Sequence, residues 1–428
     1  MRILFLNDLS DPRIGSSIRQ MYQEAARLRE LGHETALLTA VQSAAEATGA
    51  CPVTIEGCDV WKFHSEYNLR FRGFKSLSNR AVQAPLARVL AEFQPDVVHS
   101  HLLHTHISYA ALEQARRAGA GVVFTAHDVM TFCYQKLTCF HGGEAQGGML
   151  RDYSAYWQKC IPCQRLRYNP WRNAKIRAVL ARSVDRFTVV SDELGVVIRA
   201  NGIHVDRTVH NAIRPHASLP SQAEVEAFRA KFGLSGCQVI TIAGRLHEQK
   251  GVNQLFAVLA QLAPRFEKLR LLMMGKTDVY ERQFRALARD LGIESRIVPA
   301  GWLGGTELAA AYAATDIFVT PSICFDTFGL VNLEAMEHSK PVVATVFGGS
   351  PEVVKDGESG FIANPFDVPA FAASVERLLV DPELRARMGA AGRMRLEAHF
   401  TIERLTAEFL EEYELARRAA AARATLVS

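Results

Sequence analysis

The chain has 428 residues, of which 48% are hydrophobic and 22% are charged, and its net charge at pH 7 is +4. This length predicts two domains, each able to bury a full core. The composition excludes a disordered or fibrous protein, and so small a net charge does not indicate a nucleic-acid partner. No segment has the roughly 18 uncharged apolar residues of a membrane span.

Short apolar segments alternate with helical patterns along the chain, which is typical of parallel sheets covered by helices. In the first half, strands are predicted at RILFLND, ETALLTA, DVVHSH, GVVFTAHD and RFTVVS. The segment from Gly15 to Leu31 has helical periodicity, and its apolar face comprises Ile18, Met21, Tyr22, Ala25 and Leu28. Asp8 in the first apolar segment indicates a strand and not a signal peptide.

Two stretches of the first half are basic. Residues 62–88 hold six basic residues and one acidic residue, Glu66. Residues 153–184 contain no acid, and aromatic residues are interleaved with their cations: Lys159, Arg165, Arg167, Arg172, Lys175, Arg177 and Arg182. Two interpretations stay open, a solvated face or a contact with an anionic acceptor or the lipid headgroups of a cytoplasmic leaflet.

Four of the eight cysteines lie close together in the sequence, at Cys133, Cys139, Cys160 and Cys163. The pair in KCIPC has the C-x2-C spacing of zinc sites, whereas the first pair is more widely spaced. A structural zinc, packed or surface thiols and a redox pair are the three interpretations. Because no export signal accompanies the cysteines, we expect reduced thiols and a cytoplasmic location.

The alternating pattern breaks at HNAIRPHASLP, residues 210–220, and restarts at QVITIAGR. Further strands are predicted at LRLLMMGK, SRIVPAGW, IFVTPS, PVVAT and SGFIAN. We therefore expect two doubly wound α/β domains, 1–213 and 214–428, with a cleft between the carboxyl edges of their sheets. The Ala/Arg-rich tail after Leu415 is expected to fray.

The string AGRLHEQKGVNQLFAVLAQL predicts an anion site. Arg245 ends a strand, and Lys250 precedes Gly251 at the start of an amphipathic helix. Two cations beside the free N–H groups and the dipole of a helix N-terminus attract a negative group such as a diphosphate. The alternative is that both cations pair with surface carboxylates.

The stretch PSICFDTFGLVNLEAM predicts a second part of the same site. A strand leads through a loop into a helix near Gly329, where free backbone N–H groups would face a phosphate. Glu334, about one turn further on, can accept hydrogen bonds from vicinal hydroxyls such as those of a ribose. The alternatives are a helix N-cap for Asp326 and a solvated helix position for Glu334.

Two motifs are absent from the sequence. The first helix opens with a single glycine, Gly15, where the dinucleotide fingerprint G-x-G-x-x-G needs three, which disfavours a dehydrogenase. There is also no Asp-x-Asp metal motif, and we expect no cofactor and no catalytic metal.

The order and spacing of these segments resemble family-4 glycosyltransferases with the GT-B fold, the glycosyl transferases group 1. The resemblance rests on GRLHEQKG, on Asp326 and Glu334 with seven residues between them, and on PVVAT, GGSPEVV and GESGF. In the first half, GHE, PDVVHSH, FTAHD, VVSDEL and HNAI fit the same pattern. The similarity runs from Arg2 to about Phe409.

The resemblance implies roles for individual residues. Arg245 and Lys250 would hold the donor diphosphate, Glu334 would bind the nucleotide ribose, and Asp326 would touch the donor sugar. The first acid of the motif is usually Glu, so Asp326 is one methylene shorter than expected. The remaining implied positions are Thr327, Phe328, Gly329 and Leu330 at the donor, His127 at the reaction centre, and Gly15 in a loop that closes on the donor.

The function implied by the resemblance is a retaining hexosyltransferase that moves a sugar from a UDP- or GDP-linked donor to an acceptor hydroxyl. It would act in the synthesis of a polysaccharide, another glycoconjugate or a glycosylated metabolite, with His127, Arg245 and Lys250 as catalytic residues. The first domain would bind the acceptor, with peripheral contact at the inner face of the membrane. The second domain would bind the nucleotide-sugar, and its final helix would pack back across the first. Two alternatives stay open: a sugar-nucleotide epimerase or hydrolase of the same fold, and a non-catalytic nucleotide-sugar-binding module.

Overall fold

A computed structural model describes residues 1–11 and 16–427, which form two compact units. Unit 1 comprises Met1–Leu137, Tyr153–Asn211 and Ile402–Ser428, and unit 2 comprises Thr138–Asp152 and Ala212–Thr401. The chain thus passes into unit 2 for a short segment, returns, and passes over again beside the predicted boundary at residue 213. The last helix belongs to unit 1.

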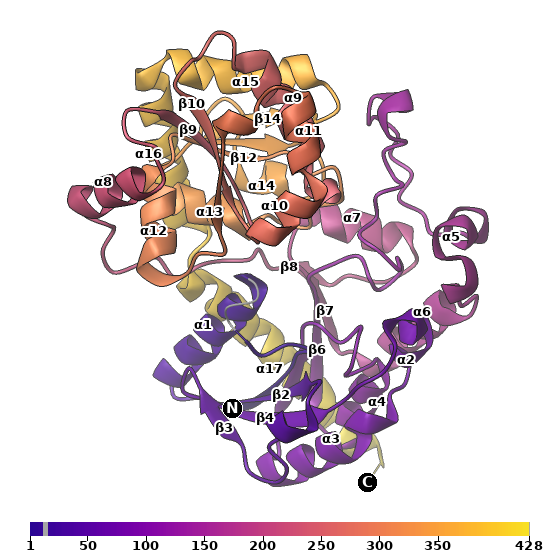
Figure 1. The fold of residues 1–428 in the computed structure, drawn as a ribbon. Coiled ribbons are helices and arrows are strands. Elements are labelled where there is room, and N and C mark those ends of the chain that lie inside the picture. The colour runs from indigo at the N-terminus through magenta and orange to yellow at the C-terminus, as the bar shows by residue number, and fades with distance from the viewer. Residues whose placement is uncertain (12–15, 428) are drawn as a thin grey trace. The chain divides into compact units, whose positions relative to one another are not determined.

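The sheet of unit 1 is parallel except at one edge, and its order is β3-β4-β2-β1-β5-β6-β7-β8 (Figure 1). Only β3 runs antiparallel to its neighbour among the described strands. Each residue of β5 and β6 is buried, as expected for parallel strands covered on both faces. The strands are β1 (Arg2–Leu6), β2 (Glu34–Val41), β3 (Val53–Ile55), β4 (Cys58–His64), β5 (Val97–Ser100), β6 (Gly121–Ala126), β7 (Arg186–Val189) and β8 (Arg207–Thr208).

The helices of unit 1 cover this sheet. The long last helix, α17, packs against β6 and α1 (Figure 1). The helices are α1 (Ser16–Glu30), α2 (Arg72–Lys75), α3 (Arg80–Phe93), α4 (Ala110–Arg117), α5 (Trp157–Gln164), α6 (Arg172–Ser183), α7 (Asp192–Ala200) and α17 (Ile402–Val427). Short 3-10 turns are η1 (Ala44–Glu46), η2 (Leu69–Phe71) and η4 (Arg165–Arg167).

The sheet of unit 2 is parallel throughout its described strands, in the order β11-β10-β9-β12-β13-β14. This order reverses between β9 and β12, as in doubly wound nucleotide-binding folds, so a crevice is expected beyond the carboxyl ends of these two strands. The strands are β9 (Gln238–Ala243), β10 (Leu269–Met274), β11 (Ile297–Gly301), β12 (Ile317–Thr320), β13 (Val342–Thr345) and β14 (Gly360–Ala363).

The helices of unit 2 bury the core of that sheet. At α8, Ser221 and Glu224 form a capping box that satisfies free N–H groups of the first turn. The helices are α8 (Gln222–Lys231), α9 (Val252–Leu262), α10 (Thr277–Gln283), α11 (Arg285–Asp290), α12 (Gly305–Ala314), α13 (Leu330–Glu337), α14 (Ser350–Val353), α15 (Val368–Val380) and α16 (Pro382–His399). The 3-10 turns are η3 (Glu144–Gln146), η5 (Glu248–Lys250) and η6 (Glu294–Arg296).

The predicted α/β fold is confirmed, and each strand predicted in either half is present. The predicted apolar face of α1 is buried throughout, from Ile18 to Leu28. The sequence reading missed the edge strands β3 and β8 and also β4, which lies between β3 and β2. Fraying after Leu415 was a wrong expectation: α17 continues to Val427, because Ala416 and Ala420 are buried and Arg423 pairs with Asp185.

Candidate active site

The crevice of unit 2 brings together two segments that are far apart in the sequence. The segment after β9 contains Arg245 and Lys250, and the segment after β12 contains Asp326 and Gly329. Ile323 and Cys324 donate backbone hydrogen bonds to the carbonyl of Gln249, at 3.0 and 3.1 Å. The two segments therefore lie side by side at the strand ends where doubly wound sheets bind ligands.

Glycine is needed where these segments meet. Gly251 has φ +74° and is the N-cap of α9, and a Cβ atom there would lie 1.7 Å from the carbonyl oxygen of Pro321. No side chain caps the helix. The first N–H groups of α9 are thus left for a ligand, and the buried face predicted for this helix, Val252, Leu255, Leu259 and Leu262, is confirmed.

Lys250 and Asp326 form an ion pair, with Nζ 2.9 Å from Oδ2. The same oxygen accepts a hydrogen bond from the hydroxyl of Ser322 at 3.1 Å. Burial lowers the pKa of Lys250, but the charge of Asp326, the nearby Cys324 and the hydrogen bond to Asp326 together outweigh burial and raise the pKa above its ordinary value. The lysine is therefore charged. Its partner, Asp326, is the residue assigned to the donor sugar.

Arg245 is exposed and forms no ion pair with any described residue. Its charge acts on Lys250, opposing the effect of Asp326 on the lysine's pKa, so the two cations are close to each other. The alternative in which both cations pair with surface carboxylates is therefore wrong for Arg245. Lys250 does pair with a carboxylate, but that carboxylate, Asp326, is itself assigned to the donor.

The start of α13 offers a second set of donors. Gly329, with φ +84°, is its N-cap and has no side-chain cap, so the alternative role of Asp326 as N-cap is wrong. Two buried groups beside Gly329, the amide nitrogen of Asn332 and the hydroxyl of Ser350, have no hydrogen-bond partner in the described chain. An unsatisfied buried donor is costly, and a bound anion would satisfy it.

The side chains of this turn divide into core and exposed positions. Phe328 is 1% exposed and packs against Phe400, so only its backbone can meet a ligand. Thr327 and Leu330 are half-buried. The carbonyl of Asp326 accepts from the N–H of Gly349 at 2.8 Å, which ties the turn to the GGSPEVV segment after β13.

Glu334 is half-buried on α13 and is held by Tyr312 of α12, whose hydroxyl donates to Oε2 at 2.6 Å. It is therefore not a freely solvated helix residue. One carboxylate oxygen is oriented by the tyrosine, and such a preorganised carboxylate suits a pair of vicinal hydroxyls. Sequence reasoning missed Tyr312.

An aromatic cluster in unit 2 lies against the same loop and was also missed. Phe140 packs edge-on against Phe325 and Phe347, with ring centroids 6.0 and 5.3 Å apart. His141 stacks on Phe347. Phe140 and His141 belong to Thr138–Asp152, which is separated from the rest of unit 2 in the sequence. Only its packing reveals that it forms a wall of the donor unit.

The histidine assigned to the reaction centre lies in unit 1. His127 follows β6, and its Nε2 lies 2.7 Å from Nδ1 of His101, which follows β5. The two strands are parallel neighbours, so both rings come from the carboxyl edge of the sheet. Because one nitrogen of such a pair must donate and the other accept, the tautomers of the two rings are linked, and the hydrogen bond orients His127.

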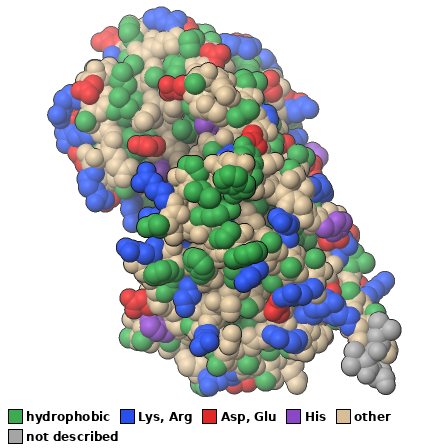
Figure 2. All heavy atoms as spheres, turned by 90° about the vertical axis from the view of Figure 1, so that its right-hand side faces the viewer, with side chains coloured by type: hydrophobic (Ala, Val, Ile, Leu, Met, Phe, Trp, Pro, Cys, Tyr) green, Lys and Arg blue, Asp and Glu red, His purple; other side chains and the backbone are tan. Residues whose placement is uncertain are grey.

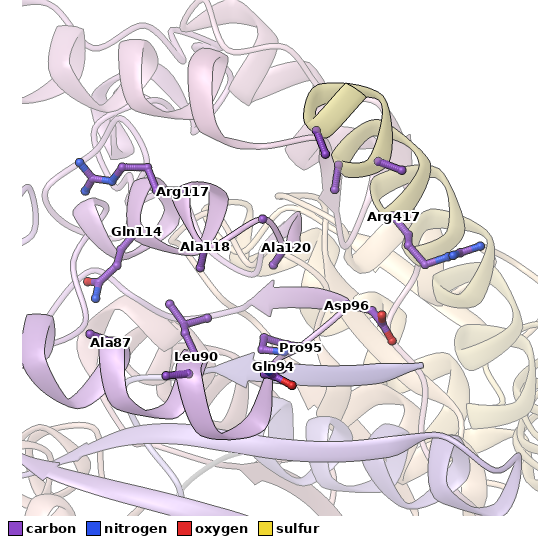
Figure 3. A pocket seen from close by; sticks show the side chains of 15 residues that line it. Ala87, Leu90, Gln94, Pro95, Asp96, Gln114, Arg117, Ala118, Ala120 and Arg417 are labelled. Atoms are coloured by element: carbon purple, nitrogen blue, oxygen red, sulfur yellow. The ribbon is translucent and has the colours of Figure 1, made fainter. Parts of the chain in front are cut away.

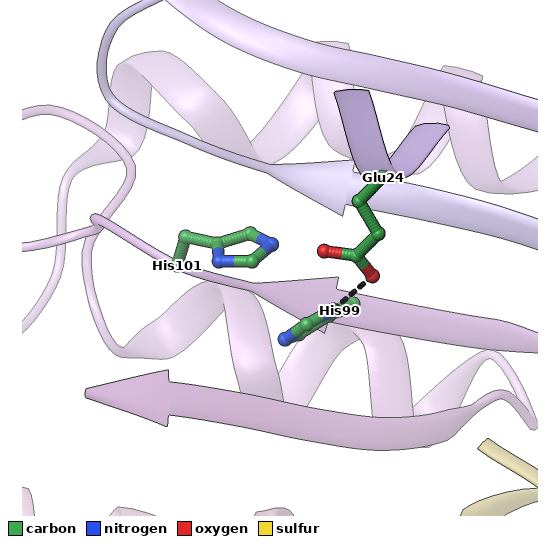
Figure 4. A group of neighbouring side chains, drawn as sticks. All are labelled: Glu24, His99 and His101. Atoms are coloured by element: carbon green, nitrogen blue, oxygen red, sulfur yellow. Dashed lines mark ion pairs between the residues drawn. The ribbon is translucent and has the colours of Figure 1, made fainter. Parts of the chain in front are cut away.

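A buried polar network continues beneath these rings (Figure 4). His99 contacts the ring of His101, with centroids 4.0 Å apart, and bonds through Nδ1 to the hydroxyl of Tyr413 at 2.7 Å. Glu24 points from α1 toward both rings, and its Oε1 accepts from Tyr413 at 2.5 Å. The network therefore connects His101 with α1 and α17.

Burial sets the protonation of this network. It lowers the pKa of His127 to about 4, although Asp128 partly offsets it, and lowers the pKa of His99 and His101 well below their usual value. Burial also raises the pKa of Glu24 to about 8, although the hydrogen bond from Tyr413 partly offsets it. At pH 7 the three imidazoles are neutral, and Glu24 is mostly a neutral carboxylic acid.

The two basic stretches lie side by side in unit 1. The amide of Asn169 donates to the carbonyl of Gly73 at 3.1 Å. Large apolar side chains are exposed on both stretches, and Figure 2 shows cationic and hydrophobic side chains interspersed on the face that carries α5 and α6. They are Leu69, Phe71, Phe74, Tyr156, Trp157, Ile161, Leu166 and Trp171. We call these eight residues and the cations Arg70, Lys75, Arg165 and Arg167 the basic-aromatic surface.

Arg172 does not belong to this surface, contrary to its place among the predicted cations. It is 2% exposed, it donates to the carbonyl of Met130, and its guanidinium lies 4.7 Å from the ring centre of Tyr134. Its periodicity within α6 gives no indication of this, because its carbonyl partner precedes it by 42 residues.

A groove of about 730 Å³ in unit 1 lies away from these residues (Figure 3). Gln114 and Arg117 of α4 line one end, and Asp96 and Arg417 line the other. Asp96 and Ala120 directly precede β5 and β6, so the groove lies at the amino edge of the sheet. Parallel sheets bind their ligands at the opposite edge, and we assign the groove no catalytic role.

Comparisons with known proteins place the chain in a family. The family model for glycosyltransferase family 4 matches residues 19–216, and the model for glycosyl transferases group 1 matches residues 224–395. The chain belongs to the family-4 glycosyltransferases of the GT-B fold. The family and the enzyme class expected from the motifs are thereby confirmed.

One curated relative of this family-4 protein is a GDP-mannose-dependent alpha-(1-6)-phosphatidylinositol monomannoside mannosyltransferase from Mycolicibacterium smegmatis. It is 34% identical over 171 residues, which cover 39% of this chain and 44% of the relative. The chain thus matches less than half of that relative's length.

Two solved structures show the same GT-B fold over nearly the full length of this family-4 protein. Sucrose-phosphate synthase from Thermosynechococcus elongatus has a TM-score of 0.75 at 20% identity, covering 98% of this chain and 99% of that one. The Anabaena protein HepE in complex with UDP-glucose has a TM-score of 0.70 at 17% identity, covering 97% and 99%. At these identities the likeness is one of fold.

Some predictions for this family-4 protein remain untested. Gly15 lies outside the described residues. Cys139 belongs to unit 2, whereas Cys133, Cys160 and Cys163 belong to unit 1. A zinc site shared by the four would need ligands from both units, and it stays a prediction. Among the described helices, none has the length and apolar character needed to cross a bilayer.

Proposed function

We propose that this protein is a retaining glycosyltransferase that moves a sugar from a UDP- or GDP-linked donor to an acceptor hydroxyl without a catalytic metal. The observation that carries the proposal is the arrangement in unit 2 of Lys250, Arg245, Asp326 and Glu334 around the starts of α9 and α13. Family membership supports it, as do the GDP-mannose dependence of one similar protein and the UDP-glucose bound to another.

The leaving diphosphate determines what the site must stabilise. When the sugar–phosphate bond breaks, negative charge develops on the diphosphate, and the sugar becomes oxocarbenium-like. Arg245, Lys250 and the uncapped helix starts at Gly251 and Gly329 supply positive charge and N–H donors for that charge. Fixed donors aimed at developing charge are among the largest contributions to catalysis.

The donor's other groups are assigned to the two carboxylates. Glu334, held by Tyr312, binds the ribose hydroxyls. Asp326 faces the sugar and is paired with the lysine that binds the diphosphate. His127 contributes a neutral imidazole at the reaction centre, where it can donate or accept a hydrogen bond but supplies no positive charge at pH 7. Family membership supports the proposed retention of the anomeric configuration, whereas the geometry alone does not bear on it.

The basic-aromatic surface of unit 1 is assigned to the acceptor side. Its cations, of which Arg70, Arg165 and Arg167 are exposed, attract an anionic acceptor or anionic lipid headgroups, and its exposed aromatic rings suit the membrane interface. We therefore propose peripheral contact with the cytoplasmic leaflet.

A donor panel tests the proposal. Thermal shifts are measured with UDP, GDP, UDP-glucose and GDP-mannose, because a ligand at about 100 times its dissociation constant stabilises a protein by about 2.7 kcal/mol. The stabilising donor is then incubated with candidate acceptors in excess chelator, and proton NMR identifies the anomer of the first product. An epimerised nucleotide-sugar indicates an epimerase, and binding without turnover indicates a binding module. An inverted anomer, or activity that needs magnesium or manganese, contradicts the proposed mechanism.

A further inference from the structure

Two imidazoles and a carboxylate meet in unit 2 at a place that the proposed transfer reaction does not use. His216 lies in the segment before α8, Glu337 ends α13, and His338 follows it. A candidate ligand atom of each residue lies within 4.8 Å of those of the other two.

Glu337 connects the segment before α8 with α13. Its Oε1 accepts hydrogen bonds from both the backbone N–H and Nδ1 of His216, the latter at 2.9 Å. The side chain of Glu337 is 3% exposed, whereas that of His216 is 57% exposed. The carboxylate is thus fixed and buried, and one imidazole faces solvent, so an ion can enter and keep a water ligand.

His338 is 7% exposed, and its Nδ1 is buried without a hydrogen-bond partner in the described chain. Its ring is parallel to that of Tyr312, with centroids 5.7 Å apart and an interplanar angle of 10°, so the imidazole cannot turn freely toward solvent. A buried polar atom without a partner is costly. This nitrogen therefore indicates that a group is missing from its surroundings.

The nearby cations do not occupy the carboxylate. Arg393 donates to the backbone carbonyl of Glu337, and Lys340 donates to that of Ala313. The positive charges of Arg393 and Lys340 reduce the attraction of the Glu337 carboxylate for a metal ion. This disfavours an ion such as Mg²⁺, which prefers oxygen ligands and binds imidazoles weakly. Two imidazoles and one carboxylate are the ligand types that Zn²⁺ binds strongly.

We propose that His216, Glu337 and His338 form a site for zinc or a similar divalent transition metal, completed by water on the His216 side. Bound metal would fasten the segment before α8 to the end of α13. The site adjoins the candidate ribose site, because Tyr312 stacks on His338 and donates to Glu334. The proposal does not depend on the identity of the sugar donor.

Calorimetric titration of the full chain, freed of metal and of any affinity tag, with zinc chloride alone tests the site. His216→Ala is the variant of choice, because this exposed loop residue can be removed without opening the core. We expect saturable binding of about one zinc more in the parent than in the variant, or affinity at least about tenfold weaker in the variant. His399→Ala, which removes another exposed histidine of unit 2, should bind zinc as the parent does.

Cobalt(II) absorption separates this site from the four cysteines. Thiolate ligands give an intense near-ultraviolet charge-transfer band that nitrogen and oxygen ligands lack. The proposal expects a cobalt signal without that band. This signal should be lost in His216→Ala and kept when Cys160 and Cys163 are both replaced by serine. The inference is overturned if the parent binds no zinc or if His216→Ala binds zinc and cobalt unchanged. It is also overturned if all the bound cobalt shows the thiolate band.

Discussion

Lys250 and Asp326 lie 76 positions apart in the sequence, yet Nζ and Oδ2 are 2.9 Å apart. The cation assigned to the diphosphate and the carboxylate assigned to the sugar thus hold each other in place before any donor binds. A bound diphosphate would share the lysine with Asp326, so binding and positioning of the sugar are connected at this pair.

Removing either cation should slow transfer severely. Lys250→Ala and Arg245→Ala should each lower kcat by about 10²–10³-fold, because each removes a fixed positive group from the developing charge of the leaving diphosphate. Steady-state kinetics measures this. Arg282→Ala, which removes an exposed arginine on α10 that pairs with Asp278, is the matched control and should leave kcat unchanged. An equal loss of kcat in Arg282→Ala would mean that the net charge of the protein, and not the position of the two cations, determines the rate.

The two carboxylates should affect different kinetic constants. Glu334→Ala should mainly raise the KM for the donor, because a ribose contact is the same in the ground and transition states, whereas Asp326→Ala should mainly lower kcat. Tyr312→Phe, which removes only the hydrogen bond to Glu334, should raise KM by roughly two- to tenfold. The reverse division between KM and kcat would show that the two roles are exchanged.

His127 should not titrate near neutrality. Burial lowers its pKa to about 4, so the rate should fall with acid only as the pH approaches that value, with no inflection near 6.5 from this residue. His101→Leu should lower kcat roughly two- to tenfold through misorientation of His127, and His101→Gln, which keeps a hydrogen-bonding group, should restore part of it. Identical pH–rate profiles and rates in all three proteins would leave His101 without a positioning role.

Glu24 should make folding stability depend on pH. Its folded pKa of about 8 lies above the usual value, so the folded state holds a proton that the unfolded chain has lost. The stabilisation is complete below about pH 4.5 and is lost as the pH rises through 8, by up to about 1.4 kcal/mol per unit.

Urea unfolding of the parent and Glu24→Gln at pH 5, 6, 7 and 8 measures this effect. The stability difference should fall with rising pH, and the buried histidines cancel because both proteins contain them. Glu46→Gln, at an exposed carboxylate of unit 1, is the control and should show a constant difference. A constant difference for Glu24→Gln as well would contradict the assignment.

The basic-aromatic surface should bind anionic membranes. Charge reversal at Arg70, Arg165 and Arg167 together should abolish binding to vesicles that contain phosphatidylserine, because each cation near an anionic surface contributes about 1 kcal/mol. Donor affinity, which depends on unit 2, should stay the same. Reversal at Arg27, Arg117 and Arg418, which lie outside both basic stretches, is the control for net charge. Equal loss in the two triple variants would indicate a non-specific charge effect.

The sequence determined the α/β fold, the strands of both halves except β3, β4 and β8, and the candidate donor residues, because each depends on local patterns. Buried parallel strands are short continuous apolar runs, and helix N-termini with adjacent cations are recognisable from a few neighbouring residues. Even the buried face of α9 follows from a period of 3.6 residues.

Only the tertiary structure decided which distant side chains meet. No local sequence pattern pairs Lys250 with Asp326 or directs Arg172 to the carbonyl of Met130. None joins Tyr413 to Glu24 and His99, and none assigns Phe140 to unit 2. These contacts depend on strand order and on long connections between strands, and the same apolar pattern is compatible with many such arrangements. The protonation of His127 is decided in the same way, because its pKa depends on how completely the surrounding elements exclude water.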